Sequence, residues 1–142
     1  DYGVLADGKS AQLFTLSNLN GLYAKISNYG GIITELHVPD RTGVLADIVL
    51  GKDSLADYID GHPYFGCITG RVAGRISGAH FKLDGSSYRL INNDGTNCLH
   101  GGQTGYDKVL WNASIIDSDG IQKLRLSYSD LDGNNGFPGQ ID

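Results

Sequence analysis

Residues 79–90 read AHFKLDGSSYRL, in which the Asp84-Gly85 pair separates two arms that alternate apolar and polar side chains. An Asp-Gly pair between such arms is a strong short-range signal for a β-hairpin, because both central turn positions need a positive φ. A second pair of alternating arms, Trp111–Ile116 and Ile121–Tyr128, flanks the turn-forming residues 117–120. The sequence therefore predicts two antiparallel hairpins.

The first third of the chain shows the same pattern of short alternating segments between turns. We expect strands at residues 12–16, 22–27, 32–38 and 48–50, the last of them short and buried. The segment Ser54–Tyr58 is expected to form one helical turn, capped by Asp53 or Ser54. The 21 glycines recur between the β-prone segments, which is typical of an all-β chain. The predicted fold is an antiparallel β-sandwich.

Composition and charge exclude several classes of partner. At 142 residues, with 40% hydrophobic and 19% charged side chains, the chain resembles an ordinary soluble globular domain. The net charge of −5 and the scattered basic residues argue against binding to nucleic acid. No apolar run approaches the roughly 20 residues that span a bilayer. The chain ends in Gln140–Asp142, which reads as the start of a further strand, so a partial domain is expected.

The cysteines and one sequon leave the compartment open. Cys67 and Cys98 are the only two cysteines, and the sequence allows either a disulfide or two buried thiols. Neither has a metal-ligating neighbour at close spacing, so no metal site is predicted. The triplet Asn112-Ala113-Ser114 matches the N-glycosylation acceptor pattern. A cytoplasmic and a secreted location therefore both remain open.

Two segments carry the candidate site. In residues 97–102, His100 stands directly before Gly101 and Gly102, and two glycines let the backbone bend so that a ligand can approach the ring. In residues 70–76, Arg71 and Arg75 lie among small residues. Together the two segments indicate a polar concave site for a neutral, oxygen-rich ligand.

The other polar and aromatic residues are interpreted as structural. Arg71 is expected to form a structural salt bridge or to brace a loop, with ligand contact as the alternative. Trp111 is expected to belong to the core rather than to stack on a ligand. Glu35 is expected to face solvent. The three other histidines, His37, His62 and His80, are interpreted as structural or solvated. Asp107 and Lys108 are expected to pair on a loop, with the alternative that Asp107 orients a site residue.

Taken in order, the motifs of this chain resemble the aldose 1-epimerase family, whose members are also called galactose mutarotases. No single motif is specific, but their order and intervals match along nearly the whole chain. The matching segments are residues 28–31, 38–41, 46–51, 63–66, 70–76, 99–102, 105–111 and 136–139. The resemblance implies that residues 1–142 are the N-terminal half of a single large β-sandwich, the mutarotase-type supersandwich.

The resemblance also implies an activity that needs no cofactor, the interconversion of the α and β anomers of free aldoses such as galactose or glucose. A base removes the proton of the C1 hydroxyl while an acid protonates the ring oxygen, and the roles reverse on closure. In the family the base is a glutamate and the acid a histidine. Both are expected outside this chain, in a C-terminal half on the same parent chain or on a separate chain.

The residues that match the family's site are supporting ones. His100 matches a histidine that binds the sugar near the ring oxygen, where it can stabilise developing charge as a catalytic residue. Arg75 matches a substrate-binding arginine, whose fork of donors suits vicinal hydroxyls. Gly74 departs from the pattern, because the family usually has asparagine there. The alternative function is a non-catalytic carbohydrate-binding module with the same sandwich.

Overall fold

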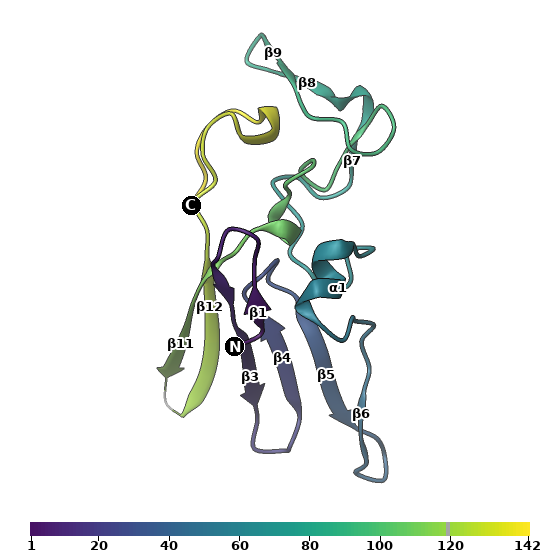
Figure 1. The fold of residues 1–142 in the computed structure, drawn as a ribbon, viewed down its shortest axis with the longest axis vertical. Coiled ribbons are helices and arrows are strands. Elements are labelled where there is room, and N and C mark those ends of the chain that lie inside the picture. The colour runs from purple at the N-terminus through teal and green to yellow at the C-terminus, as the bar shows by residue number, and fades with distance from the viewer. Residues whose placement is uncertain (119) are drawn as a thin grey trace.

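The computed structural model describes residues 1–118 and 120–142, and antiparallel strands dominate it (Figure 1). The largest sheet is a meander of four strands in chain order. Each pairs with its neighbour along the chain, and a register shift at Lys25 and Ile26 bends the β4–β5 pair. The four strands are β3 (Leu13–Ser17), β4 (Tyr23–Ser27), β5 (Ile33–Pro39) and β6 (Leu45–Asp47).

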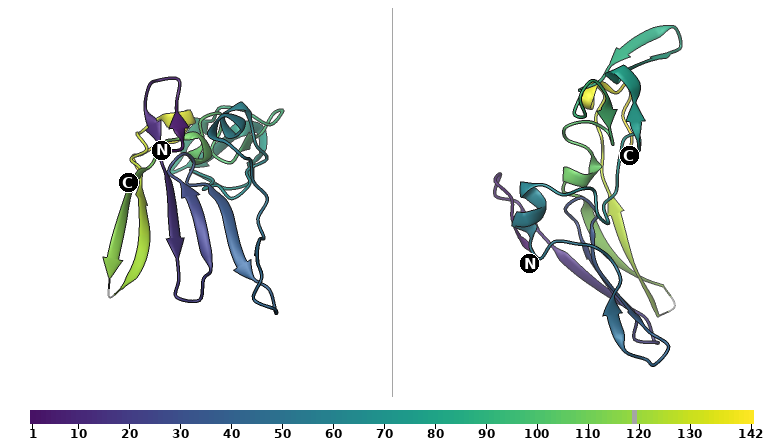
Figure 2. Two further views of the ribbon diagram at one scale, coloured as in Figure 1. Left: turned by 60° about the horizontal axis from the view of Figure 1, so that its bottom comes forward. Right: turned by 90° about the vertical axis from the view of Figure 1, so that its right-hand side faces the viewer.

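Both predicted hairpins are confirmed. Strands β11 (Asn112–Ser118) and β12 (Ile121–Ser127) pair over seven residues, and β12 lies beside β3 so that the hairpin extends the same curved layer (Figures 1 and 2). Asp119, within the predicted turn of this hairpin, lies outside the described residues. Strands β8 (His80–Leu83) and β9 (Ser86–Arg89) form the other hairpin, at the opposite end of the molecule (Figure 1).

Shorter elements connect the two ends. Strand β1 (Gly3–Val4) pairs with β2 (Ser10–Ala11), and β7 (Arg75–Ile76) pairs with β10 (Cys98–Leu99). The helical turn expected at residues 54–58 is confirmed as α1 (Leu55–Asp60), and its cap is Ser54, whose hydroxyl accepts from the Asp57 N–H. Three single 3-10 turns complete the fold: η1 (Ser77–Ala79), η2 (Tyr106–Lys108) and η3 (Asn134–Gly136).

Two separate apolar clusters hold these elements together. The first joins the main sheet to α1 and β2 through Ala11, Tyr29, Ile32, Leu55 and Tyr58. The second lies under the β8–β9 hairpin and contains Ala79, Leu90, Cys98 and Phe137. Residues 61–75 run from α1 at the sheet end of the molecule to β7 at the other end, and they include Arg71 and Arg75 (Figure 1).

The prediction of a buried strand at residues 48–50 is wrong. Ile48 and Leu50 are 62% and 71% exposed, and the strand that pairs with β5 on the side opposite β4 is instead β6 at Leu45–Asp47. The Asp47 carboxylate explains the boundary, because it accepts the backbone N–H groups of Leu36 and Val49 and turns the chain out of the sheet. The strand expected at 140–142 is likewise reduced to one bridge between Asp130 and Ile141.

The all-β antiparallel class is thus confirmed, with one six-residue α-helix as the exception. No helix among residues 1–118 and 120–142 has the length and apolar character needed to cross a membrane.

Candidate functional site

Antiparallel pairing of β7 with β10 brings the two candidate segments together. Leu99 lies opposite Arg75 and Cys98 opposite Ile76. His100 therefore lies next to Gly74, one position beyond the end of the pair. The sequence predicted that residues 70–76 and 97–102 form one site, and this register places them side by side.

His100 is held to Gly74 by two hydrogen bonds. Its backbone N–H donates to the Gly74 carbonyl at 3.0 Å, and its ring Nδ1 accepts from the Gly74 N–H at 3.1 Å. Because Nδ1 is the acceptor, the neutral ring carries its proton on Nε2. His100 is partly exposed, so it can offer that N–H as a hydrogen-bond donor outside the protein's own network.

The two glycines after His100 let the backbone bend sharply, as expected. His100, Gly101 and Gly102 all have positive φ, at 51°, 93° and 99°. A Cβ on Gly101 would overlap the Gly70 carbonyl oxygen. Glycine is therefore required at position 101 so that one backbone segment can approach another.

Asn93 is a positioning residue that the sequence analysis missed. Its side-chain oxygen accepts from the Leu99 N–H at 2.7 Å, and its Nδ2 donates to the carbonyls of Leu99 and Gly102 at 2.9 and 3.0 Å. The amide thus binds the backbone on both sides of His100. The sequence showed only a turn-rich run at this point, and an asparagine in such a run carries no signal that it reaches six to nine residues further along the chain.

Arg75 extends from β7 into solvent beside this loop. Its side chain is 61% exposed, and its Nε donates to Asp94 Oδ2 at 2.7 Å. That hydrogen bond holds the pKa of Asp94 below its ordinary value. The described hydrogen bonds of Arg75 use only Nε, which leaves the remaining donors of the guanidinium free to bind a hydroxylated ligand.

Arg71 is structural, as expected. Its Nε and Nη2 bind Asp130 Oδ2, each at 2.8 Å, and Nη1 donates to the carbonyls of Pro138 and Gly139. The Asp130 carboxylate is nearly fully buried and also accepts from the Tyr106 hydroxyl. Arg71 therefore ties the segment that carries the site to the C-terminal loop.

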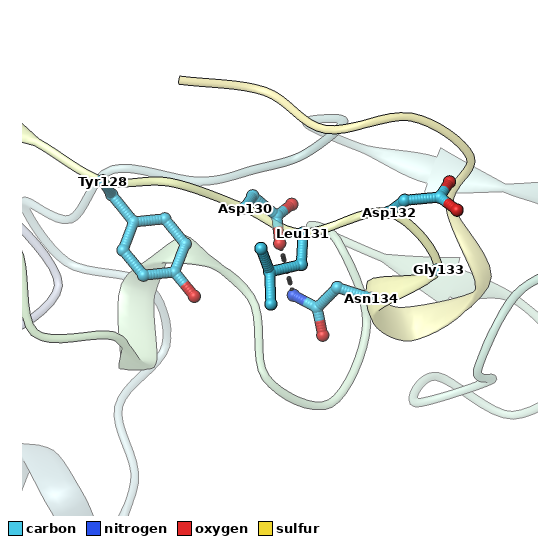
Figure 3. A pocket seen from close by; sticks show the side chains of 6 residues that line it. All are labelled: Tyr128, Asp130, Leu131, Asp132, Gly133 and Asn134. Carbon is cyan, nitrogen blue, oxygen red and sulfur yellow. Dashed lines mark hydrogen bonds between the residues drawn. The ribbon is translucent and has the colours of Figure 1, made fainter.

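A hollow beside this Arg71–Asp130 pair does not belong to the His100 site. It has a volume of about 390 Å³, and Asn134 donates across it to Asp130 at 2.6 Å (Figure 3). A larger hollow, about 680 Å³, lies against the main sheet, and residues of the Lys25–Glu35–His37 network line it. Neither His100 nor Arg75 lines either of these two hollows, so both hollows are separate from the β7–β10 pair.

Of the remaining predictions, the one for Glu35 is wrong and the one for Trp111 is confirmed. Glu35 does not simply face solvent: it is half-buried and accepts from Lys25 at 2.9 Å, with His37 Nε2 at 3.0 Å. Trp111 packs against Tyr106 and Tyr128, which confirms its structural role.

Of the two interpretations of His62, structural or solvated, burial supports the structural one, and Asp107 is buried beside it. The side chains of His62 and Asp107 are 2% and 1% exposed, and they face each other across 3.8 Å. Lys108 lies 3.6 Å from the same carboxylate oxygen of Asp107, as the expected pairing requires. The loop position of Asp107 gave no sign of this burial.

The cysteines are free thiols. Burial, followed by the nearby Asp107 charge, raises the pKa of Cys67 to about 11, and burial raises the pKa of Cys98 as well. Both therefore remain protonated near neutral pH. Within the described ranges, 1–118 and 120–142, no three His, Cys, Asp or Glu side chains are grouped to hold a metal ion.

Comparison with known proteins adds the family context. The family model described as aldose 1-epimerase matches residues 12–142. The galactose mutarotase of Sus scrofa is 47% identical over 120 residues, which cover 84% of this chain and 34% of that protein. The aldose 1-epimerase of Haemophilus influenzae is 36% identical over 136 residues, covering 96% of this chain and 38% of that protein.

A solved structure agrees with the fold. The galactose 1-epimerase of Lactobacillus acidophilus superposes with a TM-score of 0.83 and 29% identity, covering 99% of this chain and 40% of that one. The chain thus spans between a third and two fifths of the length of these relatives, less than the half that the motifs suggested.

Proposed function

This chain belongs to the aldose 1-epimerase family, and we propose that the whole protein interconverts the α and β anomers of a free aldose, with galactose or glucose as substrate. The observation that carries the proposal is the family match over residues 12–142. The relatives described above bear the names of enzymes, which favours turnover over the alternative of a carbohydrate-binding module.

The reaction assigns a specific task to the His100 ring. When the pyranose opens, the C1 hydroxyl loses a proton and the bond from C1 to the ring oxygen breaks, so negative charge develops on that oxygen until it is protonated. A fixed N–H donor aimed at this oxygen stabilises the charge as it forms. The Nε2–H of His100 is such a donor, because the Gly74 N–H keeps Nδ1 as the acceptor.

Arg75 is proposed to bind the sugar hydroxyls. Its guanidinium is already oriented by Asp94, and its remaining N–H groups form a planar fork that matches two neighbouring hydroxyls. Gly74 lacks the side-chain amide that the family usually has here, and its own N–H is engaged by His100. Its contribution is therefore to hold the imidazole, with one sugar contact fewer than the family pattern.

The proton transfers themselves are proposed to need an acid and a base outside this chain, since the matched segments contain neither of the family's two. In this division of labour, residues 1–142 bind the sugar and stabilise its ring oxygen. The acid and the base that transfer the protons belong to the rest of the protein and complete the site.

Polarimetry of the whole protein with freshly dissolved α-galactose and α-glucose tests the proposal. The optical rotation is expected to reach its equilibrium value faster than in buffer alone. A rate equal to the uncatalysed rate for both sugars, with sugar binding still measurable by calorimetry, would instead support the carbohydrate-binding module.

A further inference from the structure

Tyr64 lies against the candidate site, although neither its position nor its role was apparent from the sequence. Its ring centroid is 4.5 Å from that of His100, with the two planes tilted by 55°. Burial raises the pKa of Tyr64, as do the charges of Asp107 and Asp94, while Arg75 lowers it. The Tyr64 ring is therefore a direct neighbour of the His100 imidazole.

The backbone of Tyr64 has an uncommon conformation for a residue of its size. Its φ is 63°, in the left-handed region that bulky side chains rarely occupy. Such conformations persist where neighbouring groups enforce them, and they cluster at ligand sites. Here the enforcing contact is a hydrogen bond from the Tyr64 N–H to Nδ1 of His62 at 3.1 Å.

His62 is fixed from behind. Its ring packs edge-on against Tyr58 of the first apolar cluster, with centroids 5.5 Å apart. Because Nδ1 accepts from Tyr64, the neutral ring carries its proton on Nε2, and Nε2 faces Asp107 Oδ2 at 3.8 Å. Among the described residues, neither Asp107 carboxylate oxygen nor His62 Nε2 has a hydrogen-bond partner, though all three atoms are buried.

Buried polar atoms without partners are rare, and each calls for an explanation. Replacing a buried charged pair by apolar side chains is often neutral or stabilising, so stability alone is weak support for keeping the pair, even with Lys108 Nζ at 3.6 Å from Asp107 Oδ2. The Asp107–His62 pair ends at the one backbone N–H that holds Tyr64 in its left-handed conformation. The contacts run from Asp107 through His62 to Tyr64, that is, from the core outward to the site. This order indicates that the Asp107–His62 pair positions Tyr64.

We infer that the aromatic ring of Tyr64 is a further sugar-contacting group of this site, which packs on the apolar C–H face of the aldopyranose, and that His62 and Asp107 are its positioning residues. The inference rests on the proposed function and deepens it. Aromatic rings combine a large apolar surface with little conformational freedom, which suits stacking on a sugar face. Tyr64 would then form one wall of the site beside the Nε2–H of His100 and the free donors of Arg75.

Galactose affinity of the whole protein, measured by calorimetry, and KM and kcat, measured by polarimetry, test the inference together. Tyr64→Asn removes the ring but keeps a residue that tolerates positive φ, and it is expected to raise Kd and KM about tenfold with little change in kcat. Tyr64→Phe keeps the ring and should stay within about threefold of the wild type.

The positioning role is tested by a double-mutant cycle. Asp107→Asn alone is expected to raise KM about threefold, and the double variant Asp107→Asn/Tyr64→Asn should be no worse than Tyr64→Asn by itself, because Asp107 acts only through Tyr64. Tyr23→Leu is the matched control, since it breaks another tyrosine–histidine stack, with His37 at 4.3 Å in the main sheet. Its KM should not change.

The outcomes separate the two proposals. A wild-type protein that binds galactose without turnover contradicts the proposed activity, while the Kd values still test Tyr64. Equal Kd values for wild type and Tyr64→Asn overturn the sugar contact, and a wild type that binds neither galactose nor glucose overturns both proposals. Additive effects of Asp107→Asn and Tyr64→Asn overturn the positioning role.

Discussion

His100 and Gly74 bind each other in both directions: the His100 backbone donates to the Gly74 carbonyl, and the Gly74 N–H donates to the His100 ring. The pair of hydrogen bonds fixes the place of the imidazole and also its tautomer. A backbone N–H cannot accept a hydrogen bond, so a ring protonated on Nδ1 would lose this contact. Of the two tautomers of the neutral ring, the geometry therefore favours the one with its proton on Nε2.

Replacing this donor should slow the reaction. In the whole protein, His100→Asn is expected to lower kcat for galactose by about 10²-fold, the usual cost of removing one preorganised donor. His80→Asn is the control, because His80 is exposed on β8 and, among the described residues, its ring has a hydrogen bond only with the nearby Gly78 carbonyl. An unchanged rate in His100→Asn would mean that the imidazole serves packing alone.

Restoring the missing amide should strengthen sugar binding. Gly74 has a φ of 83°, and no atom lies within 4 Å of where its Cβ would be. Asparagine tolerates such a conformation better than most residues, so Gly74→Asn is expected to fold and to lower KM by about two- to tenfold, the value of one hydrogen bond. Gly74→Ala brings the strain without the amide and should not lower KM. A KM for Gly74→Asn equal to that of Gly74→Ala would contradict the prediction.

The loop around His100 should depend on Asn93. Asn93→Ala removes three hydrogen bonds to Leu99 and Gly102 and is expected to reduce the free energy of unfolding by about 1–3 kcal/mol. It should also lower kcat, since His100 loses its fixed orientation. Urea unfolding and polarimetry measure the two effects. Asn92→Ala removes a single bond to the Gly95 carbonyl and provides the comparison.

Acidification should destabilise the fold through His62. Burial lowers the pKa of His62 below its ordinary value near 6.5, with Lys108 and Lys52 acting in the same direction and Asp107 opposing them. The unfolded chain therefore takes up a proton at higher pH than the folded one, and stability falls as the pH drops below that value.

The His62 contribution can be isolated by substitution. The Tm of the wild type should decrease from about pH 7 to about pH 5 more steeply than that of His62→Gln, which has no proton to take up here. Calorimetric scans over this range measure the difference. Parallel curves for the two proteins would show that another group is responsible.

The isolated 142-residue chain should not catalyse the reaction. None of its residues matches the family's acid or base, so polarimetry with freshly dissolved α-galactose should give the uncatalysed rate. Catalysis above that rate by residues 1–142 would show that the acid and base lie among them, and would reassign the roles proposed above.

The hairpins were predictable because their information is local. Asp84 and Gly85 adopt the positive φ that a tight turn requires, and the alternating arms on either side fix the register. Residues 48–50 were not predictable in the same way. Their apolar character indicates a buried strand, but the contact that ends the pairing comes from the Asp47 carboxylate to Leu36, eleven residues away.

The site was predictable in part for the same reason. The glycines around His100 and the motif around Arg75 signal an unusual backbone locally, and the β7–β10 register brings them together. The sequence does not locally indicate the contacts that give Asn93, His62 and Tyr64 their roles. Tyr64 follows a proline in a loop, and nothing in that pattern shows that its ring reaches a histidine thirty-six positions later.

Arg71 has a consequence for the order in which the protein takes shape on the ribosome. It lies four positions before Arg75, yet its carboxylate partner is Asp130, 59 positions further along the chain, and its last carbonyl partner is Gly139. A nascent chain that has emerged as far as His100 already contains the proposed sugar contacts Tyr64, Arg75 and His100, but the segment that carries Arg75 still lacks its anchor. Because such distant contacts close large loops, they form late, and we expect sugar recognition to mature only after the C-terminal loop has been synthesised.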